Sequence, residues 1–205
     1  MSLVTSDWLE NNLGDVKIID CSWHMPGIDS NAKEEYSKNH IPGAIFFDLD
    51  KNSDQDTDLP HMLPTKKKWE EIVSSMGISN TDRIVIYDNS DVLSSCRGWY
   101  NFIYFGHDKN LVSVLDGGLK KWLIEKKKTT NEKIILKNST YRATENKNLV
   151  KSILEINENI KQKNIAQKVI DEENFKLSGK VVTKLSELKN YCTAEEYHQK
   201  YLEKR

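Results

Sequence analysis

Short apolar runs alternate with helical patterns over the first two-thirds of the chain. Four of these runs are partly β-branched and are bounded by Asp, Cys or Gly: Val16–Asp20, Ala44–Phe47, Ile84–Tyr87 and Leu111–Leu115. Runs of this length and composition are typical of strands that are buried on both faces of a parallel sheet. The pattern therefore predicts four buried parallel strands.

Five helical stretches lie between and around these runs, and their ends carry ordinary start and stop signals. Thr65 is a suitable N-cap after Pro64, and Gly77 and Gly106 follow two of the stretches. The predicted helices are Ser6–Leu13, Ala32–Asn39, Thr65–Met76, Leu93–Phe105 and Leu119–Lys126. The alternation predicts an α/β domain over residues 1–126, with a parallel sheet and helices on both of its faces.

The pattern changes after residue 126. Residues 127–148 are rich in Lys, Thr and Asn, and we interpret them as an inter-domain linker. A predicted amphipathic helix over Leu149–Ile160 and a predicted strand over Gln167–Asp171 repeat the helix-then-strand unit at the start of the chain. We therefore expect residues 149–171 to be the truncated start of a second unit. Residues 172–205 form a tail that cannot build a core alone.

Composition narrows the classes of function. Apolar residues make up 38% of the chain, enough for a core, and a net charge of −1 gives no electrostatic case for nucleic acid or a membrane surface. No secretory signal opens the chain, and no apolar run approaches the roughly 20 residues of a membrane span. The three cysteines are Cys21, expected in the core, Cys96 and Cys192, and their spacing suits neither a disulfide framework nor a metal site. We expect a cytoplasmic protein, or a mitochondrial one if eukaryotic, without cofactor or metal.

Four segments between residues 36 and 122 contain turn residues and candidate functional residues, and they follow one another in a definite order. They are YSKNHIPGAIFF at 36–47, DLPHMLP at 58–64, IVIYD, SSCRGW and FGH within 84–107, and LDGGLKKW at 115–122. Pro42 and Gly43 reverse the chain after His40, which is expected to be a buried, hydrogen-bonded turn residue. Together the segments resemble the N-terminal half of tandem rhodanese-type sulfurtransferases, the thiosulfate and 3-mercaptopyruvate sulfurtransferase family.

The resemblance implies a rhodanese-like fold and transfer of sulfane sulfur from thiosulfate or 3-mercaptopyruvate to a thiophilic acceptor. Its partners would be small sulfur-containing anions or thiols. In catalytic domains of the family, a cysteine directly after a buried strand attacks the sulfur and becomes a persulfide. Asp88 stands at that position here. A carboxylate cannot serve as this nucleophile, so the resemblance implies a catalytically incomplete half.

Four residues are candidates for a site. By resemblance, Asp50 and His61 belong to an acid–base relay whose serine comes from the missing catalytic loop. The alternative is that Asp50 caps a turn and His61 is an exposed loop residue. Arg97 is a candidate contact for a substrate anion, or else part of a structural salt bridge. Cys96 is a surrogate nucleophile if the helix terminus and Arg97 stabilise its thiolate, and otherwise a buried apolar side chain.

The tail carries a second resemblance. Residues 180–202, with the run AEEYHQ at 194–199, resemble the C-terminal segment of peptide methionine sulfoxide reductases. The Gly-Cys-Phe-Trp motif of those enzymes does not occur in the chain, and Cys192 is not its nucleophile. Three functions stay open: an incomplete sulfurtransferase, a non-catalytic binding module on the same fold, and a methionine sulfoxide reductase fusion remnant. Without a second domain, we expect exposed apolar surface near His61 and Met62 and self-association through that face.

Overall fold

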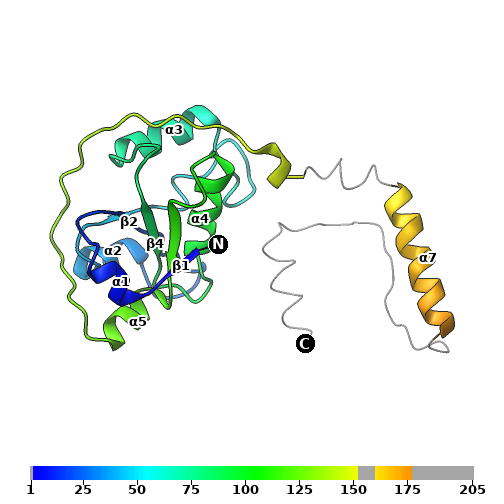
Figure 1. Ribbon diagram of the computed structural model, residues 1–205, viewed down its shortest axis with the longest axis horizontal. Helices are drawn as coiled ribbons and strands as arrows, with labels where there is room; N and C mark the ends of the chain where they lie inside the picture. The colour runs from blue at the N-terminus through cyan, green and yellow to red at the C-terminus, as the bar shows by residue number, and fades with distance from the viewer. Residues whose placement is uncertain (1, 152–159, 177–205) are drawn as a thin grey trace. The chain divides into compact units, whose positions relative to one another are not determined.

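Five parallel strands form one sheet in the order β1-β5-β4-β2-β3. Figure 1 shows this sheet, with β1, β2 and β4 labelled. The computed structural model describes residues 2–151 and 160–176, and the sheet belongs to the first of two compact units, Met1–Leu149. The strands are β1 (Ser2–Val4), β2 (Lys17–Asp20), β3 (Ala44–Phe46), β4 (Ile84–Tyr87) and β5 (Val112–Leu115). The four predicted strands are confirmed. The edge strand β1 was not predicted because it is short and mostly exposed.

Four helices connect the strands and a fifth follows β5, and the α/β prediction is confirmed. They are α1 (Ser6–Glu10), α2 (Ala32–Lys38), α3 (Lys66–Ser75), α4 (Ser95–Tyr104) and α5 (Gly118–Ile124). Thr65 caps α3, because its hydroxyl accepts the Lys68 backbone N–H at 3.3 Å. The predicted start of the fourth helix at Leu93 is wrong. Leu93 has φ 52°, a left-handed conformation that no residue of a right-handed helix adopts, and the helix begins at Ser95.

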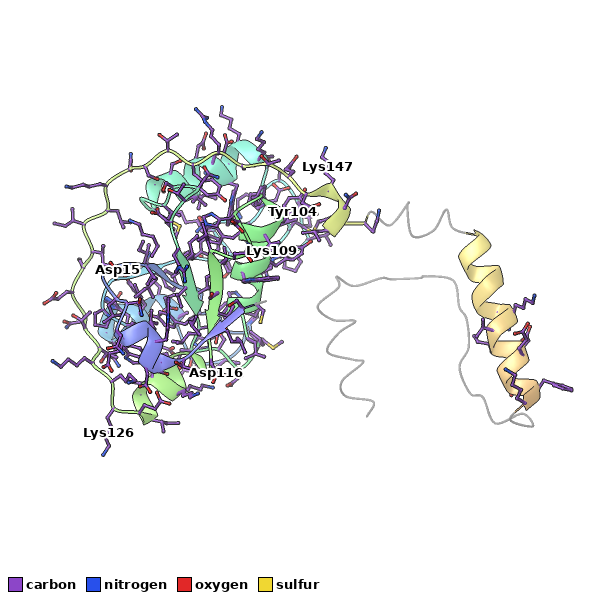
Figure 2. The ribbon with its side chains drawn as sticks, viewed as in Figure 1. Asp15, Tyr104, Lys109, Asp116, Lys126 and Lys147 are labelled. Atoms are coloured by element: carbon purple, nitrogen blue, oxygen red, sulfur yellow. The ribbon has the colours of Figure 1, made fainter. Side chains whose placement is uncertain are left out.

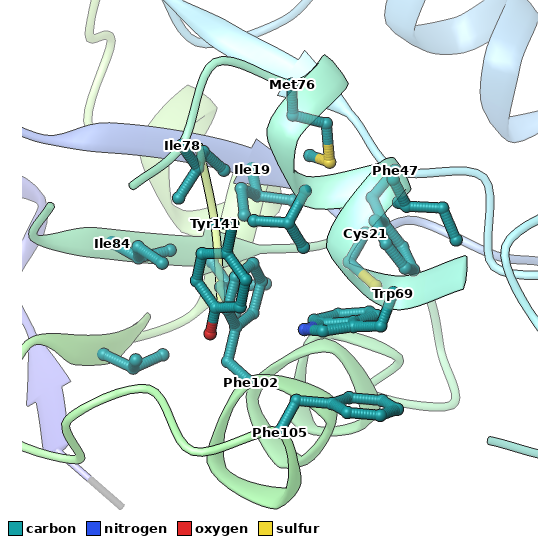
Figure 3. Packing of buried hydrophobic residues seen from close by; sticks show 14 of the residues in the cluster. Ile19, Cys21, Phe47, Trp69, Met76, Ile78, Ile84, Phe102, Phe105 and Tyr141 are labelled. Carbon is teal, nitrogen blue, oxygen red and sulfur yellow. The ribbon is translucent and has the colours of Figure 1, made fainter. Parts of the chain in front are cut away.

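The sheet has a hydrophobic core on each face, because successive strand residues point to opposite sides. Ile19 belongs to the core that Trp69 of α3 and Phe102 of α4 complete (Figure 3). Its neighbour Ile18 belongs to the core on the other face, which contains residues of α1 and α5. Aromatic rings fill the first core: Trp69 stacks on Phe105 at 4.7 Å between ring centroids. Helices on both faces explain why the strands read as continuous apolar runs.

Residues 127–149, the strap, continue from the end of α5 around the outside of the first unit (Figures 1 and 2). Residues 127–148 of the strap were predicted as an inter-domain linker. The strap is extended, as a linker would be, but it is packed against the domain. Its Tyr141 side chain is 1% exposed and lies in the aromatic core (Figure 3). Its backbone pairs with the domain at both ends, through Thr130 with His40 and through Thr144 with Phe105. The physical unit therefore extends to residue 149.

Two glycines at helix ends leave room for the strap. Gly77 follows α3 and Gly106 follows α4, and both have positive φ, 69° and 82°. A Cβ atom on Gly77 would lie 2.6 Å from the Lys137 carbonyl oxygen, and one on Gly106 would lie 2.6 Å from that of Thr144. Each glycine thus ends a helix and permits close approach of the strap backbone.

The expected strand over Gln167–Asp171 is wrong, since these residues lie inside α7 (Ile160–Lys176) of the second unit. Strong helix formers, chiefly Lys, Gln and Glu, surround the single Val-Ile pair of this run and outweigh its β propensity. Of the helix expected over Leu149–Ile160, residues 152–159 lie outside the described residues. So do the tail from residue 177 and Cys192. Within the described ranges, no helix has the length and apolar character of a membrane span.

Replacing Tyr141 with Ala should lower the free energy of unfolding by about 3 kcal/mol, because it empties a ring-sized space in the aromatic core. Urea denaturation measures the loss. Arg142→Ala is the matched control on the same segment, since its side chain is 79% exposed, and it should change the free energy by less than about 0.5 kcal/mol. Equal, small effects of both substitutions would show that the strap is not part of the folded core.

His107 should make the stability of the domain depend on pH. Its ring stacks on Tyr141, and burial lowers the pKa of His107 below its ordinary value of 6.5. The unfolded chain therefore binds the proton first as the pH falls, and stability is lost as the pH drops below about 6.5. Between about pH 7.5 and about pH 5.5, the wild type should lose up to about 1.4 kcal/mol more than His107→Gln. Parallel urea curves at both pH values check this, and identical pH dependence of the two proteins would contradict it.

Candidate functional site

The predicted site residues come from loops at one edge of the sheet and from the first turn of α4. The carboxyl ends of β4, β2 and β3 lie side by side, because these strands are parallel neighbours. The loops that leave them are residues 88–94, 21–31 and 47–65. Ligands of open α/β sheets bind at this edge. The fold therefore gathers the candidates into one region.

Asp50 and His61 form a hydrogen-bonded pair. His61 Nε2 lies 2.7 Å from Asp50 Oδ1, and both residues line a shallow cavity of about 220 Å³. The His61 side chain is only 11% exposed, so the expectation of an exposed loop histidine is wrong. The turn after β3 has its side-chain cap from Asp48, whose carboxylate accepts the Lys51 N–H at 3.1 Å. The structure thus brings the two predicted relay members together, and their catalytic role stays a prediction.

Trp23 contacts both members of the pair, and sequence reasoning missed it. Its indole Nε1–H is shared between the two carboxylate oxygens of Asp50, each at 3.0 Å. Its ring meets the His61 ring edge-on, with 4.8 Å between centroids and an interplanar angle of 88°. Only its position in the sequence could have identified Trp23 as a site residue, since it is the third residue after β2, at the carboxyl ends of the strands.

Arg97, in the first turn of α4, also reaches the pair. Its guanidinium donates a hydrogen bond to the backbone carbonyl oxygen of His61 and lies over the Tyr100 ring, 5.6 Å from the centroid. His61 has φ 55°, a left-handed conformation that is uncommon for a residue other than glycine. Arg97 therefore holds the strained backbone at His61, and its contact with a substrate anion stays a prediction.

Asp88 is buried, at 6% exposure, directly after β4. Its carboxylate Oδ2 accepts the backbone N–H of Ser95 at 2.6 Å, in the first turn of α4. Its backbone carbonyl accepts the N–H of Leu119 at 2.9 Å, at the start of α5. An N-terminal amide group of a helix, which would otherwise be open to a bound anion, is thus satisfied by this side chain.

The surroundings of Cys96 disfavour a thiolate. Burial raises the pKa of the Cys96 thiol, and the nearby charge of Asp88 raises it further. Both effects oppose the stabilisation of a Cys96 thiolate by the helix terminus and Arg97, and its role as a surrogate nucleophile stays a prediction. Cys21 is fully buried in the core, as predicted, and burial raises its pKa strongly.

His40 is a structural residue, as predicted. It is 1% exposed, stacks on Tyr36 at 4.1 Å between ring centroids, and its Nδ1 lies 2.6 Å from the Tyr36 carbonyl oxygen. Metal ligation has no candidate in residues 2–151 and 160–176, where no group of three or more His, Cys, Asp or Glu side chains is placed to hold an ion. Among the predicted site residues, the acid–base chemistry is therefore that of the Asp50–His61 pair.

Two protein families match different parts of the chain. Residues 5–125 match the rhodanese-like domain, and residues 138–205 match peptide methionine sulfoxide reductase. The first match covers more than half of the chain, and the second covers the region of the predicted tail resemblance.

Individual proteins of known identity extend the first match. Thiosulfate/3-mercaptopyruvate sulfurtransferase 1 of Arabidopsis thaliana, a mitochondrial protein, is 49% identical over 122 residues, which are 58% of this chain and 32% of the relative. Thiosulfate sulfurtransferase of Bos taurus is 36% identical over 170 residues, 79% of this chain and 56% of the relative. The chain thus spans between a third and somewhat over half of the length of these relatives.

Among solved structures, SseA from Escherichia coli, described as having the rhodanese fold of 3-mercaptopyruvate sulfotransferases, superposes with a TM-score of 0.71. It is 30% identical, and the match covers 76% of this chain and 60% of SseA. Sequence and structure therefore point to the same fold.

Proposed function

The chain belongs to the rhodanese-like domain family, and from this premise we propose that it is a sulfurtransferase half that is catalytically incomplete by itself. It supplies the Asp50–His61 pair, and a cysteine-bearing second domain supplies the nucleophile. The proposed substrates are those named for its relatives, thiosulfate and 3-mercaptopyruvate, with a thiol or another thiophile as acceptor. The proposed location is cytoplasmic or mitochondrial.

The buried carboxylate of Asp88 is the observation that carries this proposal. In catalytic domains of the family, the nucleophilic cysteine stands directly after the strand that corresponds to β4. The N–H groups of the following loop and helix stabilise its persulfide. Here the Asp88 carboxylate takes the Ser95 N–H itself. A negative charge at this point also repels an anionic sulfur donor, so the loop neither performs the attack nor attracts the substrate.

The Asp50–His61 geometry supports a role in proton transfer. An ionised Asp50 can only accept hydrogen bonds, so the 2.7 Å contact requires the proton to lie on His61 Nε2. This leaves Nδ1 of the neutral ring to accept a proton from a hydroxyl or thiol of the second domain. The pair is thus arranged as the orienting acid and base of a relay whose third member comes from elsewhere.

In this proposal, residues 149–171 are the incomplete start of a second rhodanese-like domain. The alignment with the Bos taurus enzyme covers 79% of the chain, more than the rhodanese-like match over residues 5–125, and so extends past the first unit. The start and extent of a second domain remain proposals.

A non-catalytic binding module is the alternative, and the apolar rim of the site favours it. Met25, Leu59, Met62 and Leu93 are 48%, 55%, 39% and 64% exposed, and all four belong to the loops that carry Trp23, His61 and Asp88. Exposed apolar side chains grouped around a site are typical of an interaction surface. A reductase fusion remnant is the third proposal, which is supported by the family match over residues 138–205.

We expect no sulfur transfer by the chain itself. After incubation with thiosulfate or 3-mercaptopyruvate, intact-mass measurement should show no gain of one sulfur atom, and thiocyanate formation from cyanide should equal that of Cys96→Ser. The reason is that Asp88 is no nucleophile and burial raises the pKa of Cys96.

In a Cys96→Ser background, Asp88→Cys should gain one sulfur from thiosulfate: its thiolate attacks the sulfane sulfur, the S–S bond breaks and sulfite leaves. Asp88→Ser in the same background is the control. A persulfide on the unmodified chain would refute the proposed incompleteness.

The apolar rim should drive weak self-association. Sedimentation equilibrium over a range of concentrations should show dimers or larger species, and the Met62→Ser, Leu93→Ser double variant should reduce the association constant by about tenfold or more, as expected for two exposed apolar side chains lost from each partner. Ile124→Ser is the matched control. Ile124 is 78% exposed and lies on α5, which packs on the face of the sheet opposite to α4. A monomer at all concentrations would exclude this surface as a self-association site.

A further inference from the structure

The loop that lacks the nucleophile contacts the Asp50–His61 pair through Trp23. The indole N–H of Trp23 lies equally far, 3.0 Å, from both Asp50 oxygens, and therefore fixes the carboxylate in the plane of the shared hydrogen bond. The edge of the same ring rests against His61. One side chain thus restrains both the acceptor and the imidazole of the pair.

Trp23 is itself held by residues 88–95. Three hydrogen bonds join this loop to the loop after β2: the Trp23 N–H donates to Ser90 Oγ at 2.9 Å, the Asn89 N–H to Ser22 Oγ at 2.8 Å, and Ser94 Oγ to the Cys21 carbonyl at 2.6 Å. Ser90 and Ser94 also bond to each other at 2.7 Å, and both are buried. Buried and satisfied hydrogen bonds of this kind fix a single conformation.

The same segment controls the backbone of His61. Asp88 fixes the first turn of α4 by accepting the Ser95 N–H, and two residues further along, Arg97 donates to the His61 carbonyl. The left-handed conformation of His61 costs free energy and persists only where its surroundings enforce it. The segment therefore restrains the pair from two sides, through Trp23 and through Arg97.

We propose that residues 88–97 are a positioning device for the Asp50–His61 pair, with Trp23 as the residue that transmits the restraint. This inference rests on the proposed function, because the loop is useful to the reaction only if the Asp50–His61 pair is part of it. Trp23 touches no reacting atom. It keeps Asp50 bonded to Nε2 of His61, and so keeps Nδ1 available as the base.

The test is the tautomer of His61, read from the imidazole ¹⁵N chemical shifts of the whole chain. In the wild type, the neutral ring should carry its proton on Nε2. In Trp23→Phe, Asp50 is no longer held in the orientation that accepts the Nε2 proton. The ratio of the Nε2–H to the Nδ1–H tautomer should therefore fall, by up to roughly the tenfold that corresponds to loss of the hydrogen bond between Nε2 and the carboxylate. The measurement needs no sulfur donor and no second domain, so it gives an answer even if the sulfurtransferase proposal fails.

Two further variants separate positioning from general stability. Ser90→Ala removes the acceptor of the Trp23 backbone N–H without touching the pair, and should shift the tautomer ratio in the same direction by a smaller factor. Trp8→Phe is the matched control, a half-buried Trp packed on the core of the opposite face, and should leave the ratio unchanged whatever it does to stability. Should Trp23→Phe fail to fold, Ser90→Ala decides. A ratio within twofold of the wild type in the deciding variant would overturn the proposal.

Discussion

A buried carboxylate at the end of the central strand organises the functional edge of this domain. Asp88 follows β4, and it anchors two helices at once: its carboxylate accepts a backbone N–H of α4, and its carbonyl accepts one of α5. Gly118 at the start of α5 lies so close to that carbonyl that a side chain there would collide with it. The first turns of both helices are therefore tied to this position, that of α4 by the Asp88 side chain and that of α5 by the Asp88 backbone.

The same interaction fits the proposal that this half has no nucleophile of its own and uses the loop as a support. In catalytic domains of the family, the N-terminus of the helix that corresponds to α4 stabilises a sulfur anion that forms during the reaction. Here the Asp88 carboxylate accepts the Ser95 N–H of that helix, and in the proposed positioning role the loop is a rigid support. Two serines of the loop are buried: Ser90 and Ser94 bond to each other and to the neighbouring loop rather than to solvent.

The sequence predicts the parts of this structure that local pattern determines. Ile84–Tyr87 reads correctly as a buried strand because both of its faces meet apolar cores, and His40 reads as structural because of the turn that follows it. The Trp23 contact could not be predicted, since it depends on side chains 27 and 38 residues further along the chain being brought to one sheet edge. Resemblance identified Asp50 and His61, but neither resemblance nor spacing shows that their carboxylate and imidazole meet. The strap was interpreted as a linker because its composition is mostly polar. Its single aromatic residue, Tyr141, which attaches it to the core, gave no recognisable pattern.

The strap also limits where any further domain can begin. The rhodanese-like match ends at residue 125, yet the folded unit needs Tyr141 in its core and the strap backbone over Gly106. The reductase match begins at residue 138, so residues 138–149 fall within both the matched reductase segment and the first unit. Ser139, Tyr141 and Thr144 cannot keep their contacts with α3 and α4 and at the same time belong to a separate reductase core. A second fold in this chain must therefore begin after Leu149, or else it must open the aromatic core of the first.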